Sequence, residues 1–432
     1  MKFDCDGFYG TIFAIEGISD GRAVLNSPTG CRGQPAYFSD RIFPRENILN
    51  KQNFEEFFFF GQSRVPCTYL DSDDYISGST EKLKMLLPAI AEKGDTFIAI
   101  VNSPGASLIG DDLNRFLREA KLEDKCMAIE SSFYSKTVAF GFDNTIISVL
   151  KWLKLNQLPK IKRKINLLGL SIYNKHWEGT IAELTKICRL MGLDVISSPG
   201  AGSSVAEMRE SVSASYNVVI FPEYCQKTAE WYEEEFNIPY IKSPHGAPLG
   251  FTATEEWINT IADITGVDPN PALEYIREMR TAAFHKLSRF YNERGFLKGM
   301  TFSLEADGSM ALPVVRWLYE YLNMFPASVS VPPDSDPECI ANLKTFITSC
   351  SMDECLSNKP ENTPCEIFIG QGLKGTILKY NNICSENIDI ANRSSDYIDV
   401  IPKTHLGGVG SLYILEQILN SANNIKYQNV FK

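Results

Sequence analysis

The sequence lacks the short motifs that identify several common enzyme classes. It contains no HExxH or CxxC pair, no GxSxG elbow and no GxxxxGK[ST] loop. These absences argue against a mononuclear zinc site, against a serine hydrolase and against ATP binding through a P-loop. Its four histidines are widely scattered and do not have metal-ligand spacing: His176, His245, His285 and His405.

Positive charge and long apolar runs are also scarce. Lys and Arg number 42 against 53 Asp and Glu, giving a formal net charge of −11, which argues against a nucleic-acid surface. No apolar stretch approaches the ~18 residues of a membrane span, and the N-terminus has no hydrophobic secretion core. We therefore expect a cytoplasmic protein whose eleven cysteines are thiols or metal ligands and not disulfides.

What the sequence does contain is a repeated alternation of apolar strands and helices over its 432 residues. Apolar, β-branched runs at 96–101, 165–170 and 217–221 alternate with helical segments, which is typical of open parallel sheets. We predict an α/β fold of three Rossmann-like domains, at residues 1–155, 156–295 and 296–432.

The N-terminal segment places two cysteines at the ends of a helix–strand unit. Residues 10–18 predict a buried helix and residues 22–26 a short strand. Residues 27–30 (SPTG) predict a tight turn, with Pro28 and Gly30 aiming Cys31 out of the strand end. Cys5 and Cys31 are then either a ligand pair or two small buried hydrophobes, which most free cysteines are.

Further residues follow the strand predicted at 96–101. Ser103 and Gly105 lie where α/β sheets gather ligands, at the carboxyl end of a strand. Asp111 and Asp112 open the next helix and are helix caps or, less commonly, acid–base residues. Elsewhere, the four phenylalanines at 57–60 are expected in the core or a subunit interface. Residues 34–66 are expected to be irregular. Cys350 and Cys355 fall in the polar, loop-like stretch 332–364 and are interpreted as isolated surface thiols.

A series of segments in register, spread over nearly the whole chain, resembles the nitrogenase component 1 family. The clearest is LIGDDLN at 108–114. The N-terminal segment with its two cysteines and the stretch 74–83 fit the family in the same order. The remaining segments lie at 141–144, 165–169, 237–239 and 405–407. The residues at 112–114, 141–144 and 405–407 resemble the β-type subunit of the family more than the α-type subunit.

The resemblance implies an iron–sulfur cluster, 4Fe-4S or P-cluster-like, shared at a subunit interface. Cys5 and Cys31 are spaced like the family's first two cluster cysteines, and thiolates suit iron–sulfur clusters. The family's third cysteine is replaced here by Ser103, a harder oxygen donor. Cys67 is the best spare cysteine for completing the site.

The resemblance also bears on the large substrate-reducing cofactor of nitrogenase itself. The cysteine that binds this cofactor in the family aligns with Phe221 of this chain. The nearby cysteine of this chain, Cys225, lies four positions later. The cofactor's histidine ligand aligns with Asp396, while His405 belongs to the following turn. The chain is therefore not expected to anchor that cofactor in the usual way.

The function implied is that of a nitrogenase-like oxidoreductase subunit. An ATP-dependent iron protein would deliver electrons through the cluster to a substrate held between domains, and a homologous component 1 chain would be the partner in a hetero-oligomer. Two alternatives remain: a non-catalytic scaffold for metal-cofactor assembly, and a cluster-free α/β binding protein. The residues do not identify the substrate.

Overall fold

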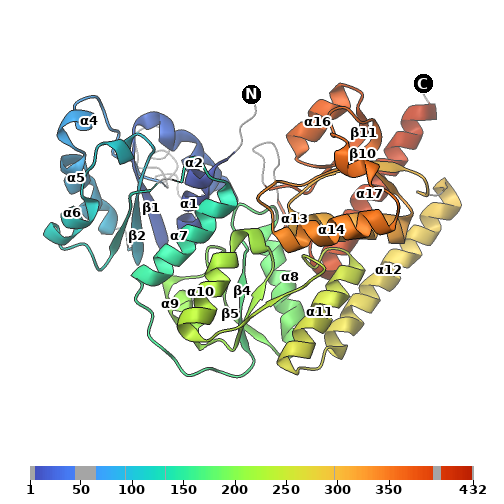
Figure 1. The fold of residues 1–432 in the computed structure, drawn as a ribbon, viewed down its shortest axis with the longest axis horizontal. Coiled ribbons are helices and arrows are strands. Elements are labelled where there is room, and N and C mark those ends of the chain that lie inside the picture. Colours follow the sequence, from blue (N-terminus) through green and yellow to red (C-terminus); the bar gives the residue numbers. More distant parts are fainter. Residues whose placement is uncertain are drawn as a thin grey trace.

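The computed structural model describes residues 5–43, 65–92, 94–131, 133–295, 297–392 and 400–430. Its strands form three open sheets, each parallel throughout (Figure 1). The first sheet has the order β1-β2-β3, with β1 Gly21–Asn26, β2 Phe97–Asn102 and β3 Cys126–Ile129. The second has the order β5-β4-β6-β7, with β4 Lys164–Leu168, β5 Asp194–Ser197, β6 Tyr216–Val219 and β7 Tyr240–Lys242. The third has the order β11-β10-β8-β9, with β8 Thr301–Glu305, β9 Phe325–Ser330, β10 Cys365–Gly370 and β11 Cys384–Asp389.

Helices connect and cover these sheets. Those of the first part are α1 Gly7–Glu16, α2 Thr29–Ile42, α4 Asp74–Ser77, α5 Thr80–Ala91, η2 Ala106–Leu108, α6 Leu113–Glu119 and α7 Val138–Trp152. The middle part has α8 Trp177–Leu190, α9 Val205–Glu210, η3 Ser211–Ser213, η4 Pro222–Tyr224, α10 Gln226–Phe236, α11 Phe251–Thr265 and α12 Asn270–Arg294. The last part has α13 Gly308–Arg316, η5 Trp317–Tyr321, α14 Pro337–Ser349, α15 Glu354–Ser357, α16 Gly372–Tyr380 and α17 Gly407–Val430. None of the described helices combines the length and apolarity that a membrane crossing requires.

The predicted fold class, three α/β units with open parallel sheets, is confirmed. One continuous hydrophobic core runs from α1 through all three sheets to α17. The C-terminal helix α17 packs against β11 and also against α8, α11 and α12 of the middle part. The domain boundaries predicted near residues 155 and 295 stay a prediction.

Two local predictions are wrong. Residues 29 and 30 are not a tight turn but the start of helix α2, which runs on to residue 42 where an irregular segment was expected. The polar stretch 332–364 contains α14 and α15, because Asp336 accepts the backbone N–H of Cys339 at 2.9 Å and so caps a helix. Cys355 is buried in α15 and is not a surface thiol. The phenylalanines at 57–60 and Asp396 lie outside the described residues.

Helix α1 is buried almost all round and crosses α7 at very short range (Figure 1). The crossing depends on glycine: a Cβ on Gly10 would lie 2.1 Å from the carbonyl oxygen of Val138, and one on Gly141 would lie 2.0 Å from that of Gly7. Thr145 donates a hydrogen bond to Thr11 across the same contact at 3.1 Å. This crossing fixes the start of α1, where Cys5 lies.

Candidate functional site

The candidate site lies at the carboxyl ends of β1 and β2. Asn26 and Asn102 end these strands and pair in register, and Asn26 Nδ2 donates to Asn102 Oδ1 at 2.9 Å. The backbone N–H of Ser103 donates to the Asn26 carbonyl at 3.0 Å. Because parallel strands share one carboxyl edge, the residues that follow both strands meet there.

Cys31 lies in the first turn of α2, directly after β1, and is half-buried. Burial raises the pKa of its thiol, the neighbouring Cys67 raises this pKa further, and a hydrogen bond with the Ser103 side chain lowers it. Ser103 is fully buried, and its Oγ accepts the Ala106 N–H at 3.3 Å. The structure therefore brings Cys31, Cys67 and Ser103 together.

Cys67 joins the site from a different segment of the chain. It forms an isolated parallel bridge with Leu25 of β1. Its Sγ lies 3.1 Å from both the hydroxyl and the carbonyl oxygen of Ser27, and it accepts the N–H of Tyr69 at 3.4 Å. Burial raises the pKa of this thiol, while its hydrogen bonds with Ser27 and the charge of Arg32 lower it.

Cys5 immediately precedes the cap of α1. Asp6 accepts the backbone N–H of Phe8 at 3.0 Å, which holds the start of the helix. Burial raises the pKa of Tyr9, and Cys5, Asp6 and Cys31 raise it further. Cys5 and Cys31 thus both lie close to Tyr9. Cys5 is therefore near the group formed by Cys31, Cys67 and Ser103.

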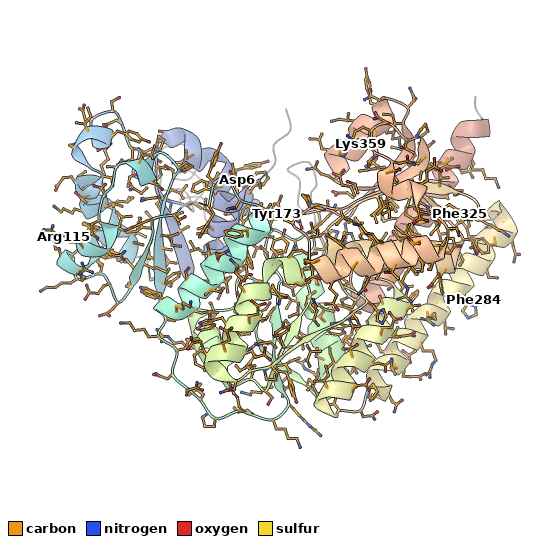
Figure 2. All side chains as sticks on the ribbon, viewed as in Figure 1. Asp6, Arg115, Tyr173, Phe284, Phe325 and Lys359 are labelled. Carbon is orange, nitrogen blue, oxygen red and sulfur yellow. The ribbon has the colours of Figure 1, made fainter. Side chains whose placement is uncertain are left out.

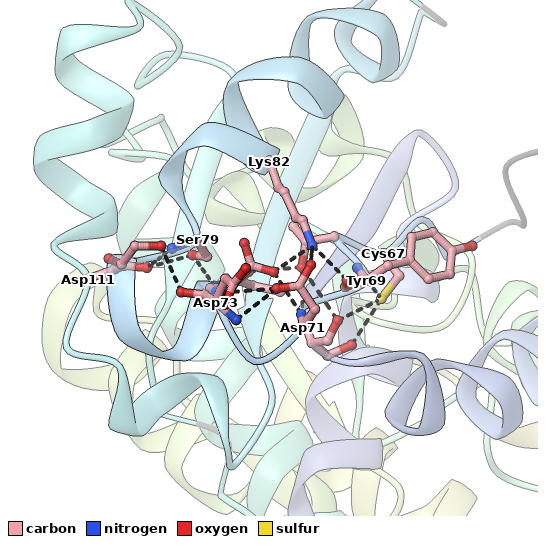
Figure 3. A network of polar contacts seen from close by, with 12 residues as sticks. Cys67, Tyr69, Asp71, Asp73, Ser79, Lys82 and Asp111 are labelled. Carbon is pink, nitrogen blue, oxygen red and sulfur yellow. Dashed lines mark hydrogen bonds and ion pairs between the residues drawn. The ribbon is translucent and has the colours of Figure 1, made fainter.

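An ion-pair network holds the loop that follows Cys67 (Figure 3). Lys82 of α5 donates to the carbonyl of Tyr69 at 2.9 Å, to Asp71 at 2.8 Å and to Asp74 at 2.5 Å. The hydrogen bond from Lys82 lowers the pKa of Asp71 to about 2. The network fixes the path of the chain from Cys67 to α5.

Of the two carboxylates before α6, Asp112 is the predicted cap of that helix, whereas Asp111 holds the start of α5. Asp111 accepts both the backbone N–H and the hydroxyl of Ser79, at 2.7 and 2.6 Å, at the start of α5 (Figure 3). Asp112 caps α6 by accepting the Arg115 N–H at 2.8 Å. Both lie beside a pocket of about 340 Å³ that Asn102 also lines.

The donors at this edge suit iron but, among the residues that the structure describes, do not form a complete metal site. No group of three His, Cys, Asp or Glu residues in the described ranges is arranged to hold a metal ion. The thiols of Cys31 and Cys67 are soft ligands of the kind that bind iron. The negative charge of an ionised Cys67 raises the pKa of Cys31, and a bound cation would offset this repulsion between the two thiolates. These donors fit part of an iron–sulfur ligand set.

Phe221, which is aligned with the cysteine ligand of the second cofactor, and His405 are both buried packing residues. Phe221 is buried after β6, and the buried thiol of Cys225 donates to its carbonyl at 3.5 Å. His405 precedes α17 as expected and is buried, with its ring stacked on Tyr413 and 4.7 Å from the ring of His176. Burial and His176 hold the pKa of His405 well below its ordinary value, so this imidazole is neutral.

The sequence analysis did not predict a set of polar contacts between the middle and C-terminal sheets, here called the seam and formed by Asn174, Lys175, Tyr224, Asp389 and Asn392. Lys175 pairs with Asp389 at 2.5 Å, with both side chains largely buried. Asn392 accepts from Asn174 at 3.0 Å and donates to the Tyr224 hydroxyl at 2.8 Å. All five residues lie at a strand end or in the segment after one, and this position is the one local signal that could have indicated them.

Comparison with solved structures identifies the fold. Nitrogenase Cp1 at pH 6.5 superposes with a TM-score of 0.76 over 98% of this chain and 94% of that chain, at 14% identity. Nitrogenase Cp1 at pH 5 gives a TM-score of 0.70 over 96% of this chain and 88% of that chain, at 16% identity. The fold is therefore that of nitrogenase component 1.

The sequence places the chain within one family. It belongs to the nitrogenase component 1 type oxidoreductases, whose family model matches residues 7–370. A subunit of the light-independent protochlorophyllide reductase of Rhodopseudomonas palustris (strain BisB18) is 26% identical over 206 residues, covering 45% of this chain and 38% of that protein. The corresponding subunit of the same enzyme in Synechococcus sp. (strain CC9311) is 25% identical over 230 residues, covering 50% and 43%. The predicted family is confirmed. The chain matches about two-fifths of the length of these two relatives.

Proposed function

We propose that this chain is one subunit of a nitrogenase-like reductase and holds half of an interface iron–sulfur cluster. The observation that carries the proposal is the meeting of Cys31, Cys67 and Ser103 at the β1–β2 edge, with Cys5 reaching the same place past Tyr9. Cys5 and Cys31 are the proposed iron ligands, and Ser103 or Cys67 completes this chain's share. A homologous chain supplies the remaining ligands.

The cluster, when bound, accepts and passes on single electrons. The protein's part is to desolvate and position the ligands: burial keeps the thiols protonated until iron displaces their protons. Lys82 anchors the loop behind Cys67 through Asp71 and Asp74, so this sulfur is held in place before metal binds. The Ser103 hydroxyl, a harder donor than a thiolate, sets this site apart from an all-cysteine one.

The same proposal names the partners. An ATP-dependent iron protein supplies the electrons, and the substrate is held between the domains of this cytoplasmic complex. The activity for which the relatives are named, protochlorophyllide reduction, supports a reductase and provides a probe substrate.

Iron and acid-labile sulfide analysis of anaerobically purified protein tests the ligands. We expect the Cys5→Ala, Cys31→Ala double variant to lose the brown colour and most of the iron. The matched control is Cys350→Ala, a half-exposed thiol at the end of α14 in the C-terminal part, which should keep both. Unchanged iron in the double variant would contradict the assignment.

Wild-type protein without iron or sulfide would instead support the cluster-free binding protein. Iron-loaded protein that shows no dithionite- and ATP-dependent reduction with its iron protein would support the assembly scaffold. The Ser103→Cys variant tests the third position independently, because a thiolate there should bind iron more strongly than the alcohol and shift the cluster's reduction potential.

A further inference from the structure

A basic connection joins the N-terminal and middle parts of the chain. Residues 151–164, from the last turn of α7 to the first residue of β4, contain five lysines, one arginine and no acidic residue. The chain as a whole has a formal net charge of −11. Figure 1 shows this connection running along the outer edge of the middle part, beyond α9 and α10. Positive charge is thus concentrated on one outer surface of an acidic protein.

Most of these cations have no acidic partner among the residues that the structure describes. Lys164 forms an ion pair with Glu210 at 2.6 Å, and Lys160 donates to the carbonyl of Val212 at 2.8 Å. The other four cations are exposed and form no ion pair: Lys151, Lys154, Lys162 and Arg163. Because neighbouring charges of one sign repel one another, an anionic partner at this surface would stabilise them.

The backbone of the connection is held against the middle part. The N–H of Ile161 donates to the carbonyl of Ser213 at 2.8 Å, and the Gln157 side chain donates to the carbonyl of Glu235 at 2.8 Å. Two aliphatic side chains nevertheless point outward, since Leu158 is 39% exposed and Ile161 is 43% exposed. The surface therefore combines lysines and aliphatic groups on an ordered backbone, which limits the entropy lost when a partner binds.

This composition fits an anionic lipid surface better than an acidic protein. Lysine is depleted at protein–protein interfaces, where arginine and aromatic residues are enriched. Here five of the six cations are lysines, and the exposed large apolar side chains, Leu158 and Ile161, are aliphatic. Clustered lysines are attracted to the negative surface of a bilayer, and aliphatic side chains between them can enter its headgroup region.

We propose that residues 151–164 bind this protein peripherally to the surface of an anionic lipid bilayer. A bridge between Asp6 and Thr137 places Cys5 beside the start of α7. The connection leaves the other end of this helix, whose 15 residues span ~22 Å. The bilayer therefore contacts the molecule away from Cys5. The inference does not rest on the proposed function.

Co-sedimentation of the purified full chain with lipid vesicles tests the proposal. Wild type should bind vesicles of equal parts phosphatidylcholine and phosphatidylglycerol, and vesicles of phosphatidylcholine alone should bind far less. Binding should weaken as salt is raised, because mobile ions screen exposed charges. A quadruple variant should lower the partition coefficient roughly 10²–10³-fold, since each cation near an anionic surface contributes about fivefold. Its changes are Lys151→Gln, Lys154→Gln, Lys162→Gln and Arg163→Gln.

The matched control removes the same charge from four exposed lysines elsewhere, through Lys286→Gln, Lys298→Gln, Lys344→Gln and Lys359→Gln. It should lose far less binding than the first variant. Leu158→Gln with Ile161→Gln should weaken binding several-fold and leave its salt dependence unchanged. No binding of wild type to the anionic vesicles, or equal losses in the two quadruple variants, overturns the proposal. Salt-sensitive retention of wild type on immobilised polyglutamate without vesicle binding also overturns it, in favour of an acidic protein.

Discussion

Replacement of Gly141 by alanine should weaken the protein by separating α1 from α7. The new Cβ would lie 2.0 Å from the Gly7 carbonyl oxygen, whereas real Cβ atoms do not approach within 3.0 Å. The two backbones must therefore move apart by about 1 Å, since neither can rotate away. Overpacking of this kind costs about 1–3 kcal/mol, and the backbone contact places it at the upper end. Alanine's helix preference returns up to about 1 kcal/mol, which leaves a net loss of about 2 kcal/mol.

The matched control is the same substitution at Gly33, an exposed position in α2 where an added Cβ meets no atom within 4 Å. There only helix propensity acts, so Gly33→Ala should stabilise the protein by roughly 0.5–1 kcal/mol. Urea unfolding curves measure both, as opposite shifts of the midpoint at constant slope. A Gly141→Ala midpoint equal to or above that of wild type would refute the close crossing of α1 and α7.

Three further predictions concern polar groups. Asp143→Ala should cost roughly 2–4 kcal/mol in urea unfolding, because this buried carboxylate accepts the N–H and hydroxyl of Thr228 at 3.0 and 2.6 Å. Ser204→Ala should cost about 1 kcal/mol in the same assay, through loss of the capping box with Glu207, and Ser204→Asp should restore most of it. Asp307 binds its proton more tightly in the folded chain, with a pKa raised from 3.8 to about 7, so its stabilising contribution is present at low pH and is lost as pH rises through about 7. The unfolding free energy of wild type should therefore fall relative to Asp307→Asn by on the order of 4 kcal/mol between about pH 4 and pH 8, and a rise would contradict the assignment.

The alternation of strands and helices was predictable because its signals are local. Runs such as 97–101 in β2 are apolar and β-branched, and they form strands buried on both faces. The turn predicted before Cys31 failed for an equally local reason. Pro28 and Gly30 are as compatible with a helix start as with a turn, and Pro28 here is the residue before α2.

The candidate site divides in the same way. Cys5 and Cys31 were predicted from one continuous segment, since a helix and a strand return the chain to one edge. The proximity of Cys67 to Cys31 depends instead on a bridge between Leu25 and Cys67, and on the contact of Cys67 with Ser27, 40 positions earlier in the chain. Family resemblance named Cys67 only as a spare cysteine, and geometry places it against Ser27.

The sequence by itself determined the parallel α/β architecture and the family, because periodicity and short motifs act within one segment. Only the tertiary structure decided that the side chain of Asp307 does not cap its own helix. An aspartate before a helix predicts a cap, yet Glu223, 86 residues away from the Ser309 N–H that it accepts, takes over that task. A contact between two sheets follows from how their cores pack together, and no local pattern encodes it.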